Sequence, residues 1–288
     1  MRVAYISSCK GKVHDIRIKA IKKILPDINF DVYVPPRKPN AKKYDVIYYA
    51  FYSLYKRMPI SHPNIVTSVT SHKCLDNLKQ TLRQLSKFKL ISVNNRKLYK
   101  EFSKHIDVIY IPNGVDTEMF YPSKRVFDPN DIVFGWIGNI DRATKNFHSI
   151  IKPLKKKFKF KTIETKKSKK YNVNHKSIVN FYHSIDFYVV SSGTEGTPNP
   201  ALEAASCGIP LITTKVGNMA DIVVNGENGY FIDSPCFDDA LDSLSMASRL
   251  SKEEYCTMSD NIKGKVRKSW SWFNRIKEFS SLFGAECE

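Results

Sequence analysis

The segment 187–214 constrains the fold of this chain more than any other part of its sequence. An apolar run at 187–190 predicts a buried strand, a turn rich in glycine and proline follows, 201–206 predicts a helix, and 211–214 predicts a second strand. The residues that break these elements are Gly193, Gly196, Pro198, Gly208 and Pro210. Backbone N–H groups and the positive helix end point at such a turn, which makes an anion site suited to a nucleotide diphosphate.

Strands and helices alternate along the rest of the chain. Before residue 128 we expect strands at 2–8, 30–34, 44–51, 65–71, 90–93 and 108–111, with helices at 14–25, 76–85 and 96–102. The pattern then restarts, with strands at 132–137, 159–164, 187–191 and 211–214 and helices at 146–158, 175–185 and 199–207. Alternation predicts parallel sheets with helices on both faces, and the restart predicts two Rossmann-like domains linked near residues 113–130.

Several segments carry motifs that resemble one enzyme family. The E-x7-E pair of Glu195 and Glu203 is followed by A-x-x-C-G-x-P-L-I-T-T, by G-x-x-x-D-I-V and by N-G-x-N-G-Y. With IPNGVDTEMFYP at 111–122, FGWIGNIDRATKN at 134–146 and WSWFNRIKEFSSLF at 270–283, these motifs resemble the retaining glycosyltransferases of family 4. The resemblance covers residues 108–285 well and the N-terminal third in outline.

The resemblance implies an α/β fold of the GT-B class. Two Rossmann-like domains would face each other across a cleft, each with a parallel sheet, and a C-terminal helix would return to the N-terminal domain. The acceptor-binding domain is expected at 1–117 with the closing helix 270–288, and the nucleotide-sugar-binding domain at 118–269. At 288 residues the chain is short for this family, so we expect trimmed loops.

The same resemblance assigns roles around the donor. Glu203 would accept both ribose hydroxyls, and Glu195 would orient the transferred sugar or support charge in the transition state. Lys145 would bind the diphosphate and stabilise the departing nucleotide, which is the main electrostatic demand of sugar transfer. The further donor-binding candidates are Gly196, Thr197, Asn199, Asn139 and Arg142.

Structural alternatives stand beside these roles. Glu203 could be a helix-surface acid favoured by the dipole, and Lys145 and Arg142 could be solvated. The family usually has an arginine where Asn139 stands, so Arg142 could supply the missing charge. Two carboxylates are also the equipment of a glycosidase, but a hydrolase needs no phosphate-binding turn.

Four residues are candidates on the acceptor side. His72 follows the strand 65–71, where relatives place a histidine facing the reaction centre; a capping histidine is the alternative. His14 follows the loop after the first strand. Lys10 and Lys12 flank Gly11, where the family has small residues, which suggests a cationic acceptor mouth.

No metal or cofactor site is expected. No D-x-D follows a strand, and no His/Cys cluster has metal-ligand spacing. The family's retaining transfer is thought to proceed by front-face attack, with the donor phosphate taking the acceptor proton, so we name no protein nucleophile. The donor would be a UDP- or GDP-sugar, its base near Lys161–Thr165.

Positive charge is concentrated in the N-terminal part. The chain has a net charge of +18, and residues 1–117 hold 22 Lys/Arg against 8 Asp/Glu, a net +14. Residues 118–288 hold 24 against 20, a net +4. Because a bias towards lysine alone would leave the acids evenly spread, this distribution favours a polyanionic acceptor or an anionic surface.

Three functions fit these observations. The first is a phage-type enzyme that glycosylates DNA bearing a hydroxymethylated base, flipped from the stack, with the lysine-rich loops 8–12 and 37–43 on the DNA. In it, the aromatic segment 48–55 would either stack on bases or form a core strand. The second is synthesis of a surface polysaccharide or glycolipid at an anionic membrane. The third, a non-enzymatic nucleotide-sugar binder, is disfavoured because both glutamates are intact.

The sequence also bears on compartment. It contains no run of 18 apolar residues, no signal peptide at its start, and six scattered cysteines without C-x-x-C. We therefore expect reduced thiols and a cytoplasmic location, in the host cytoplasm if the protein is viral, with peripheral attachment to the inner membrane as the alternative. Oligomeric state is not predicted.

Overall fold

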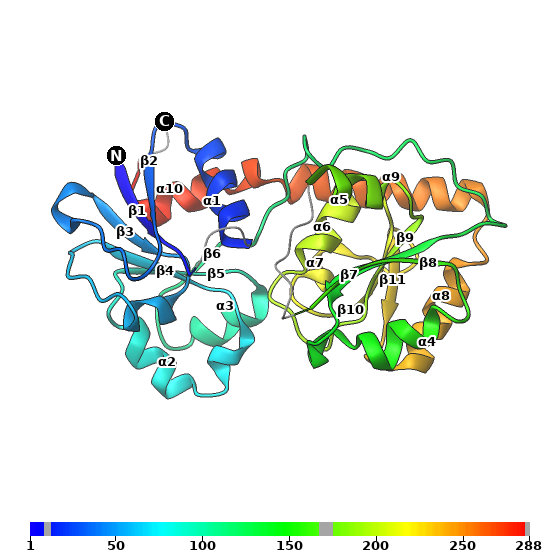
Figure 1. Ribbon diagram of the computed structural model, residues 1–288, viewed down its shortest axis with the longest axis horizontal. Coiled ribbons are helices and arrows are strands. Elements are labelled where there is room, and N and C mark those ends of the chain that lie inside the picture. The colour runs from blue at the N-terminus through cyan, green and yellow to red at the C-terminus, as the bar shows by residue number, and fades with distance from the viewer. Residues whose placement is uncertain (9–12, 167–174, 286–288) are drawn as a thin grey trace. The chain divides into compact units, whose positions relative to one another are not determined.

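The computed structural model describes residues 1–8, 13–166 and 175–285. The chain divides into two compact units (Figure 1). Unit 1 is Met1–Gly114 with Trp272–Glu288, and unit 2 is Val115–Ser271. The sequence predicted boundaries at residues 117 and 270.

Unit 1 contains a six-stranded parallel sheet in the order β2-β1-β3-β4-β5-β6. Its strands are β1 (Arg2–Ile6), β2 (Asn29–Tyr33), β3 (Val46–Tyr49), β4 (Ile65–Val69), β5 (Leu90–Val93) and β6 (Ile109–Tyr110). Helices α1 (Val13–Ile24) and α10 (Ile276–Phe283) cover one face, and α2 (Leu78–Leu85) and α3 (Arg96–Phe102) cover the other (Figure 1). Helix α10 thus belongs to unit 1.

The central strands of unit 1 are buried on both faces. Every residue of β3 and β4 is buried, because helices cover both sides of the sheet. Tyr48 and Tyr49 have no exposed surface, and the Tyr49 hydroxyl donates to the Met58 carbonyl at 2.6 Å. Of the two alternatives for the segment 48–55, the core strand is therefore correct for these two tyrosines, which cannot stack on a base.

Unit 2 contains a five-stranded parallel sheet in the order β11-β10-β9-β7-β8. The strands are β7 (Phe134–Asn139), β8 (Phe160–Thr165), β9 (Phe187–Val190), β10 (Leu211–Thr214) and β11 (Gly229–Ile232). The helices are α4 (Lys152–Leu154), α5 (His175–Tyr182), α6 (Asn199–Ser206), α7 (Met219–Ile222), α8 (Phe237–Ala247) and α9 (Lys252–Ser269). Two parallel Rossmann-like sheets are the architecture of the GT-B class.

The structure corrects the sequence interpretation in two places. The helix expected at 146–158 is a π-helical turn, Phe147–Ile151, that runs into the short α4 and ends at Leu154. Asn146, in the left-handed region at φ 52°, accepts from the N–H of Ile151 five residues on, and this widens the turn. No elements were predicted between residue 214 and the closing helix expected at 270–288. Of the helices there, α9 is mostly polar and buries only a narrow apolar row.

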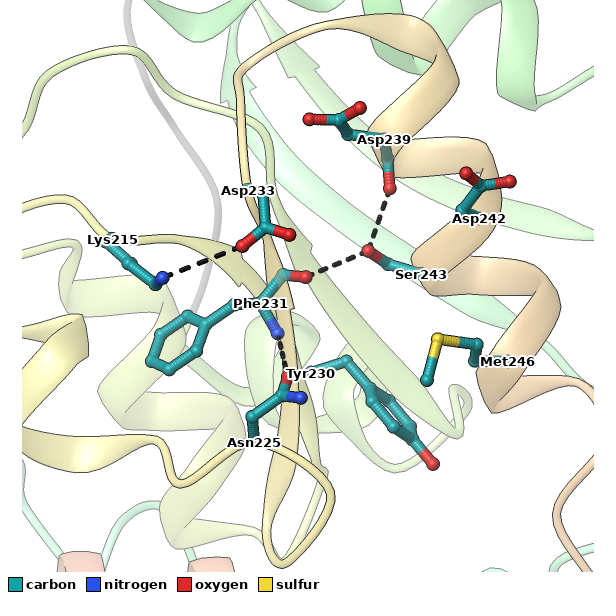
Figure 2. A pocket seen from close by; sticks show the side chains of 9 residues that line it. All are labelled: Lys215, Asn225, Tyr230, Phe231, Asp233, Asp239, Asp242, Ser243 and Met246. Carbon is teal, nitrogen blue, oxygen red and sulfur yellow. Dashed lines mark hydrogen bonds and ion pairs between the residues drawn. The ribbon is translucent and has the colours of Figure 1, made fainter.

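A pocket of about 290 Å³ lies at the edge of unit 2, between β11 and α8 (Figure 2). The Ser243 hydroxyl is within hydrogen-bond distance of the Phe231 and Asp239 carbonyls, at 3.0 and 2.8 Å. Lys215 lies 3.6 Å from Asp233 and over the ring of Phe231. Several polar groups of this pocket thus pair with one another. The pocket lies at the β11 edge of the sheet, and β8 forms the other edge.

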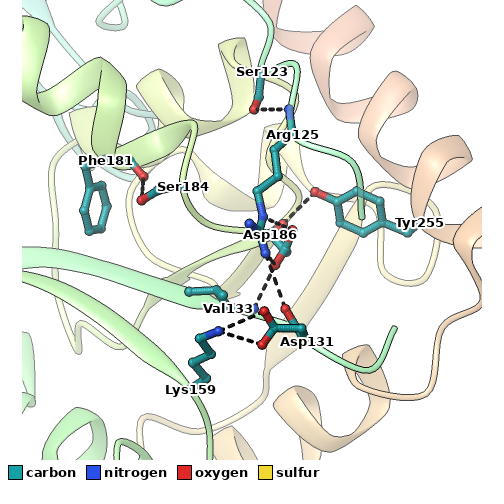
Figure 3. Close-up of polar contacts among 9 residues, drawn as sticks. All are labelled: Ser123, Arg125, Asp131, Val133, Lys159, Phe181, Ser184, Asp186 and Tyr255. Atoms are coloured by element: carbon teal, nitrogen blue, oxygen red, sulfur yellow. Dashed lines mark hydrogen bonds and ion pairs between the residues drawn. The ribbon is translucent and has the colours of Figure 1, made fainter. Parts of the chain in front are cut away.

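A buried ion pair fastens the segment that enters unit 2 to its sheet (Figure 3). Arg125 donates to both carboxylate oxygens of Asp186, at 2.7 and 3.0 Å, and Asp186 is 1% exposed. The Val133 N–H also donates to Asp186, at 2.8 Å, and the Tyr255 hydroxyl donates to its carbonyl at 3.0 Å. Asp186 thereby links the loop that carries Arg125, the residue before β7 and helix α9 to the start of β9.

Candidate functional site

The candidate site lies at the carboxyl ends of two neighbouring strands of unit 2. β7 and β9 pair in parallel, so the loops that follow them leave the sheet at the same edge. Open parallel sheets bind ligands at this edge, outside the carboxyl ends of their strands. The loop after β7 carries Lys145, and the loop after β9 carries Glu195.

Hydrogen bonds fix the two loops to each other. The Ser191 hydroxyl donates to the Lys145 carbonyl at 2.7 Å, and the Gly193 N–H donates to the Thr144 carbonyl at 2.9 Å. The Asn146 side chain donates to the Ser191 carbonyl at 2.9 Å. The backbone on both sides of Lys145 is therefore held against the strand that precedes Glu195. Sequence reasoning missed Asn146, although asparagine directly after a short helical turn is a signal for the left-handed region.

Lys145 and Glu195 form an ion pair at this edge. The Lys145 ammonium lies 2.5 Å from a carboxylate oxygen of Glu195, and the two side chains are 14% and 11% exposed. The Ser192 hydroxyl, which sequence reasoning also missed, donates to the same oxygen at 2.9 Å. Because both charges are largely shielded from water, their interaction is stronger than that of an exposed pair. The structure thus brings together the two charged residues that the sequence assigned to phosphate and sugar.

The first turn of α6 begins directly after this loop. Pro198 is its N-cap and Pro200 lies in its first turn, where a missing N–H costs no intrahelical bond. Thr197 accepts from the Asn218 side-chain amide at 2.9 Å. Gly217 has φ +57°, and a Cβ there would lie 2.3 Å from the Gly196 carbonyl oxygen. Glycine is therefore required at 217, because the two loops approach each other closely.

Glu203 lies one turn inside α6 and has a different partner. The Tyr182 hydroxyl donates to its carboxylate at 2.7 Å. Burial raises the pKa of Glu203 to about 7, although the bond from Tyr182 lowers it. Burial beside Glu203 also raises the pKa of Tyr182 well above its ordinary value. No sequence motif pointed to Tyr182, whose position depends on how α5 packs against α6.

The raised pKa of Glu203 predicts a pH-dependent stability. Unfolded glutamate ionises near 4.5, so the stability from this group is fully present below that pH and is lost as the pH rises to about 7. As the pH rises from 4.5 to 7, we expect the melting temperature of wild type to fall relative to that of Glu203→Gln, which has no carboxylate to ionise. Thermal unfolding across that range measures it, and a difference that stays constant would contradict the prediction.

The remaining donor candidates lie around the loop after β7. Asn139 ends β7, and its side chain accepts from the Asp141 N–H at 2.8 Å. Arg142 is exposed at the start of the short 3-10 helix Ala143–Lys145. Asn199 is the first residue of α6. Of the two basic candidates, the structure brings Lys145 to Glu195 and leaves the Arg142 side chain at the surface.

The acceptor-side candidates belong to unit 1. His72 begins the 3-10 helix His72–Leu75 after β4, and its Nε2 lies 3.0 Å from the Asn95 side-chain oxygen. That oxygen also accepts from the Leu98 N–H and caps α3. His14 lies in the first turn of α1. Lys10 and Lys12 lie outside the described residues.

A cluster of buried polar side chains lies in unit 1, on strands β3, β4 and β5 and on helix α1. The Ser68 hydroxyl lies 2.7 Å from the Tyr48 hydroxyl and 2.6 Å from the Ser92 hydroxyl. Arg17, which is 5% exposed, donates to Ser68 at 3.1 Å and stacks on Tyr48. Sequence reasoning placed no polar group here, because each residue comes from a different element.

The described residues contain neither a cluster of metal-ligand side chains nor a helix that could cross a membrane. Within residues 1–8, 13–166 and 175–285, no three His, Cys, Asp or Glu side chains lie together as metal ligands would. No helix in these ranges has both the length and the apolar character that crossing a membrane requires.

Comparison with known proteins gives a partial match to one family model and several distant relatives. Residues 151–263 match the family model of glycosyl transferases group 1. An uncharacterized glycosyltransferase of Methanocaldococcus jannaschii is 27% identical over 241 residues, which is 74% of this chain and 66% of that protein. The chain spans 14% to 66% of the length of the curated relatives that it matches.

Solved structures resemble the whole chain. Sucrose-phosphate synthase from Thermosynechococcus elongatus superimposes with a TM-score of 0.77 at 13% identity, covering 98% of both chains. HepE from Anabaena, in complex with UDP-glucose, gives a TM-score of 0.73 at 16% identity, covering 98% of this chain and 99% of that one. These likenesses confirm the predicted GT-B fold. At 13% and 16% identity they show the fold alone.

Proposed function

We propose that this chain is a glycosyltransferase that moves a sugar from a nucleotide sugar, bound by unit 2, to an acceptor hydroxyl. The observation that carries the proposal is the Lys145–Glu195 pair at the carboxyl ends of β7 and β9, directly before the first turn of α6. The match of residues 151–263 to glycosyl transferases group 1 supports it. So does the fold shared with HepE, which was solved with UDP-glucose.

The site residues divide the chemical work. Lys145 neutralises the diphosphate as the bond to the sugar breaks, and the N–H groups at the start of α6 add their dipoles. Glu195 accepts hydrogen bonds from sugar hydroxyls once Lys145 turns to the phosphate, and Ser192 keeps its carboxylate in place. Glu203 holds the ribose hydroxyls. His72, on unit 1, contacts the acceptor.

We propose that the transfer is retaining, because the sequence motifs resemble those of the retaining glycosyltransferases of family 4. In it the acceptor hydroxyl attacks on the face that the nucleotide leaves, and its proton passes to the departing phosphate. The carbon–oxygen bond to the phosphate breaks as the new glycosidic bond forms. No side chain is asked to act as a nucleophile.

For the acceptor we favour DNA carrying a hydroxymethylated base. The support is the charge of the N-terminal part, +14 over residues 1–117. A surface polysaccharide or glycolipid made at an anionic membrane is the second candidate, because an anionic lipid surface would be attracted by the same charge.

The donor site is tested by the substitution Glu203→Ala. Loss of a carboxylate that accepts two hydroxyls should weaken UDP- or GDP-sugar binding about 100-fold. Isothermal titration with a panel of nucleotide sugars measures it. Glu227→Ala, which removes an exposed glutamate of the same unit, should bind like wild type. Unchanged affinity in a folded Glu203→Ala protein would refute the assignment.

A further inference from the structure

One face of unit 1 concentrates positive charge that the proposed chemistry does not use. Residues 72–105 contain nine Lys/Arg against two Asp/Glu. This segment includes α2 and α3, which connect β4 to β5 and β5 to β6. Right-handed crossovers that step in the same direction put both helices on the same face of a sheet, and Figure 1 shows them together, opposite α1 and α10.

The exposed cations on these helices form two rows. Residues four apart in a helix lie on the same side, about 6 Å apart along the axis. One row follows α2 and the turn after it, and the other follows α3 and the turn after it. We call these side chains, all exposed, the basic face: Lys79, Arg83 and Lys87 in one row, Arg96, Lys100 and Lys104 in the other, and Lys97 beside the second.

The basic face costs stability that an ordinary solvated face does not. Like charges four residues apart destabilise a helix, and Arg96 and Lys97 lie at the positive end of the α3 dipole. Neither α2 nor α3 has an acidic residue in its first turn. Glu101 balances Lys104 at 2.8 Å. The other cations of the two rows, Arg96 aside, make no ion pair with any residue that the structure describes.

Helix α9 of unit 2 shows that lysine-rich composition does not by itself produce such a face. It contains lysines, but Glu253 and Glu254 occupy its first turn and Ser251 completes a capping box with Glu254. Its Lys263 pairs with Asp260 at 2.6 Å. The same chain therefore interleaves both signs on α9, whereas α2 and α3 together carry one acid, Glu101.

We propose that the basic face docks the phosphate backbone of duplex DNA. The proposal rests on the polyanionic acceptor proposed above and names the surface that holds it. Within residues 72–105, Tyr99 is the one exposed large apolar side chain, and its ring packs on Tyr110 at 6.0 Å, with Arg96 over the latter at 5.4 Å. A helix that lies in a membrane inserts several Trp, Phe or Leu side chains. Phosphates are bound by charge alone.

The test compares two triple variants of the full chain that remove equal charge. Lys79→Gln/Arg83→Gln/Lys100→Gln neutralises three cations of the basic face. Lys252→Gln/Lys265→Gln/Lys268→Gln neutralises three exposed lysines of α9 and serves as the matched control. Fluorescence anisotropy with a short duplex over a salt series gives the affinity and the slope of log K against log salt for each protein.

The basic-face variant should bind at least about tenfold more weakly than wild type, with a slope shallower by about 2.7, which is 0.9 for each lost phosphate contact. The α9 variant should bind like wild type. Equal weakening of both variants would overturn the proposal, because net charge alone would then explain binding. Wild-type binding to phosphatidylserine vesicles but not to the duplex would overturn it in favour of a membrane, and binding to neither would overturn it too.

Titration of the same samples with UDP- and GDP-sugars separates this proposal from the function itself. All three proteins should bind the donor equally, because none of the substituted residues belongs to the donor site. Donor binding without DNA binding would reject the docking surface and leave the proposed enzyme standing. Absence of donor binding in every sample would count against the proposed function instead.

Discussion

Replacing Lys145 by methionine should lower kcat for sugar transfer by about 10²–10³-fold. Its ammonium is 14% exposed and lies at the carboxyl ends of β7 and β9, where the proposed reaction releases the diphosphate. A charge that stabilises a leaving group in a site shielded from water lowers the activation barrier by about 3–4 kcal/mol. Hydrolysis of the nucleotide sugar, with water as acceptor, allows the measurement before the natural acceptor is known.

A lysine paired with a glutamate elsewhere in unit 2 provides the control. Lys155 lies 2.8 Å from Glu164 but is 35% exposed, so Lys155→Met should leave kcat within about twofold of wild type. Lys145→Met/Glu195→Gln removes both charges and tests whether an unpaired Glu195 causes the loss. Full activity in the double variant would show that Lys145 serves only to balance Glu195.

Replacing Arg125 by methionine should lower the free energy of unfolding by about 3–5 kcal/mol, because it leaves the charge of Asp186 buried with a single N–H partner. The carboxylate is 1% exposed, and beside it the pKa of the Arg125 guanidinium is held above its ordinary value. Urea denaturation followed by circular dichroism measures the change. Arg125→Met/Asp186→Asn, which removes both charges, should recover part of the loss.

A neighbouring, exposed ion pair serves as the control for the buried Arg125–Asp186 pair (Figure 3). Lys159 contacts Asp131 at 2.6 Å, but the two side chains are 57% and 53% exposed. Water screens such a pair, so Lys159→Met should change stability by less than about 1 kcal/mol. Equal losses in Arg125→Met and Lys159→Met would contradict the view that burial gives the Arg125–Asp186 pair its importance.

Sequence patterns predicted most strands of both sheets because their signal is local. Buried parallel strands appear as short apolar runs, and β3, β4 and β9 are buried at every position. The end of α6 could also be predicted from its turn residues: the helix ends at Ser206, and Gly208 adopts φ +81°. The pattern failed where local spacing was ambiguous, as at the π-helical turn after Asn146.

The candidate site shows the same division. The types and spacing of Lys145, Glu195 and Glu203 could be recognised in the sequence, because motif residues keep fixed positions along the chain. Their partners could not: Ser192 on Glu195 follows from the geometry of one loop, and Tyr182 on Glu203 comes from another helix. The raised pKa of Glu203 is likewise invisible in the sequence, since it arises from burial.

The sequence by itself determined the class of fold and the uneven distribution of charge, and it predicted which residues meet a nucleotide sugar. These depend on order and composition along one chain. Only the tertiary structure decided that Lys145 pairs with Glu195, that Arg125 pairs with Asp186, and that the lysines of α2 and α3 share one face. Ion pairs and surfaces depend on distances between residues far apart in the chain, and packing of the sheets sets those distances.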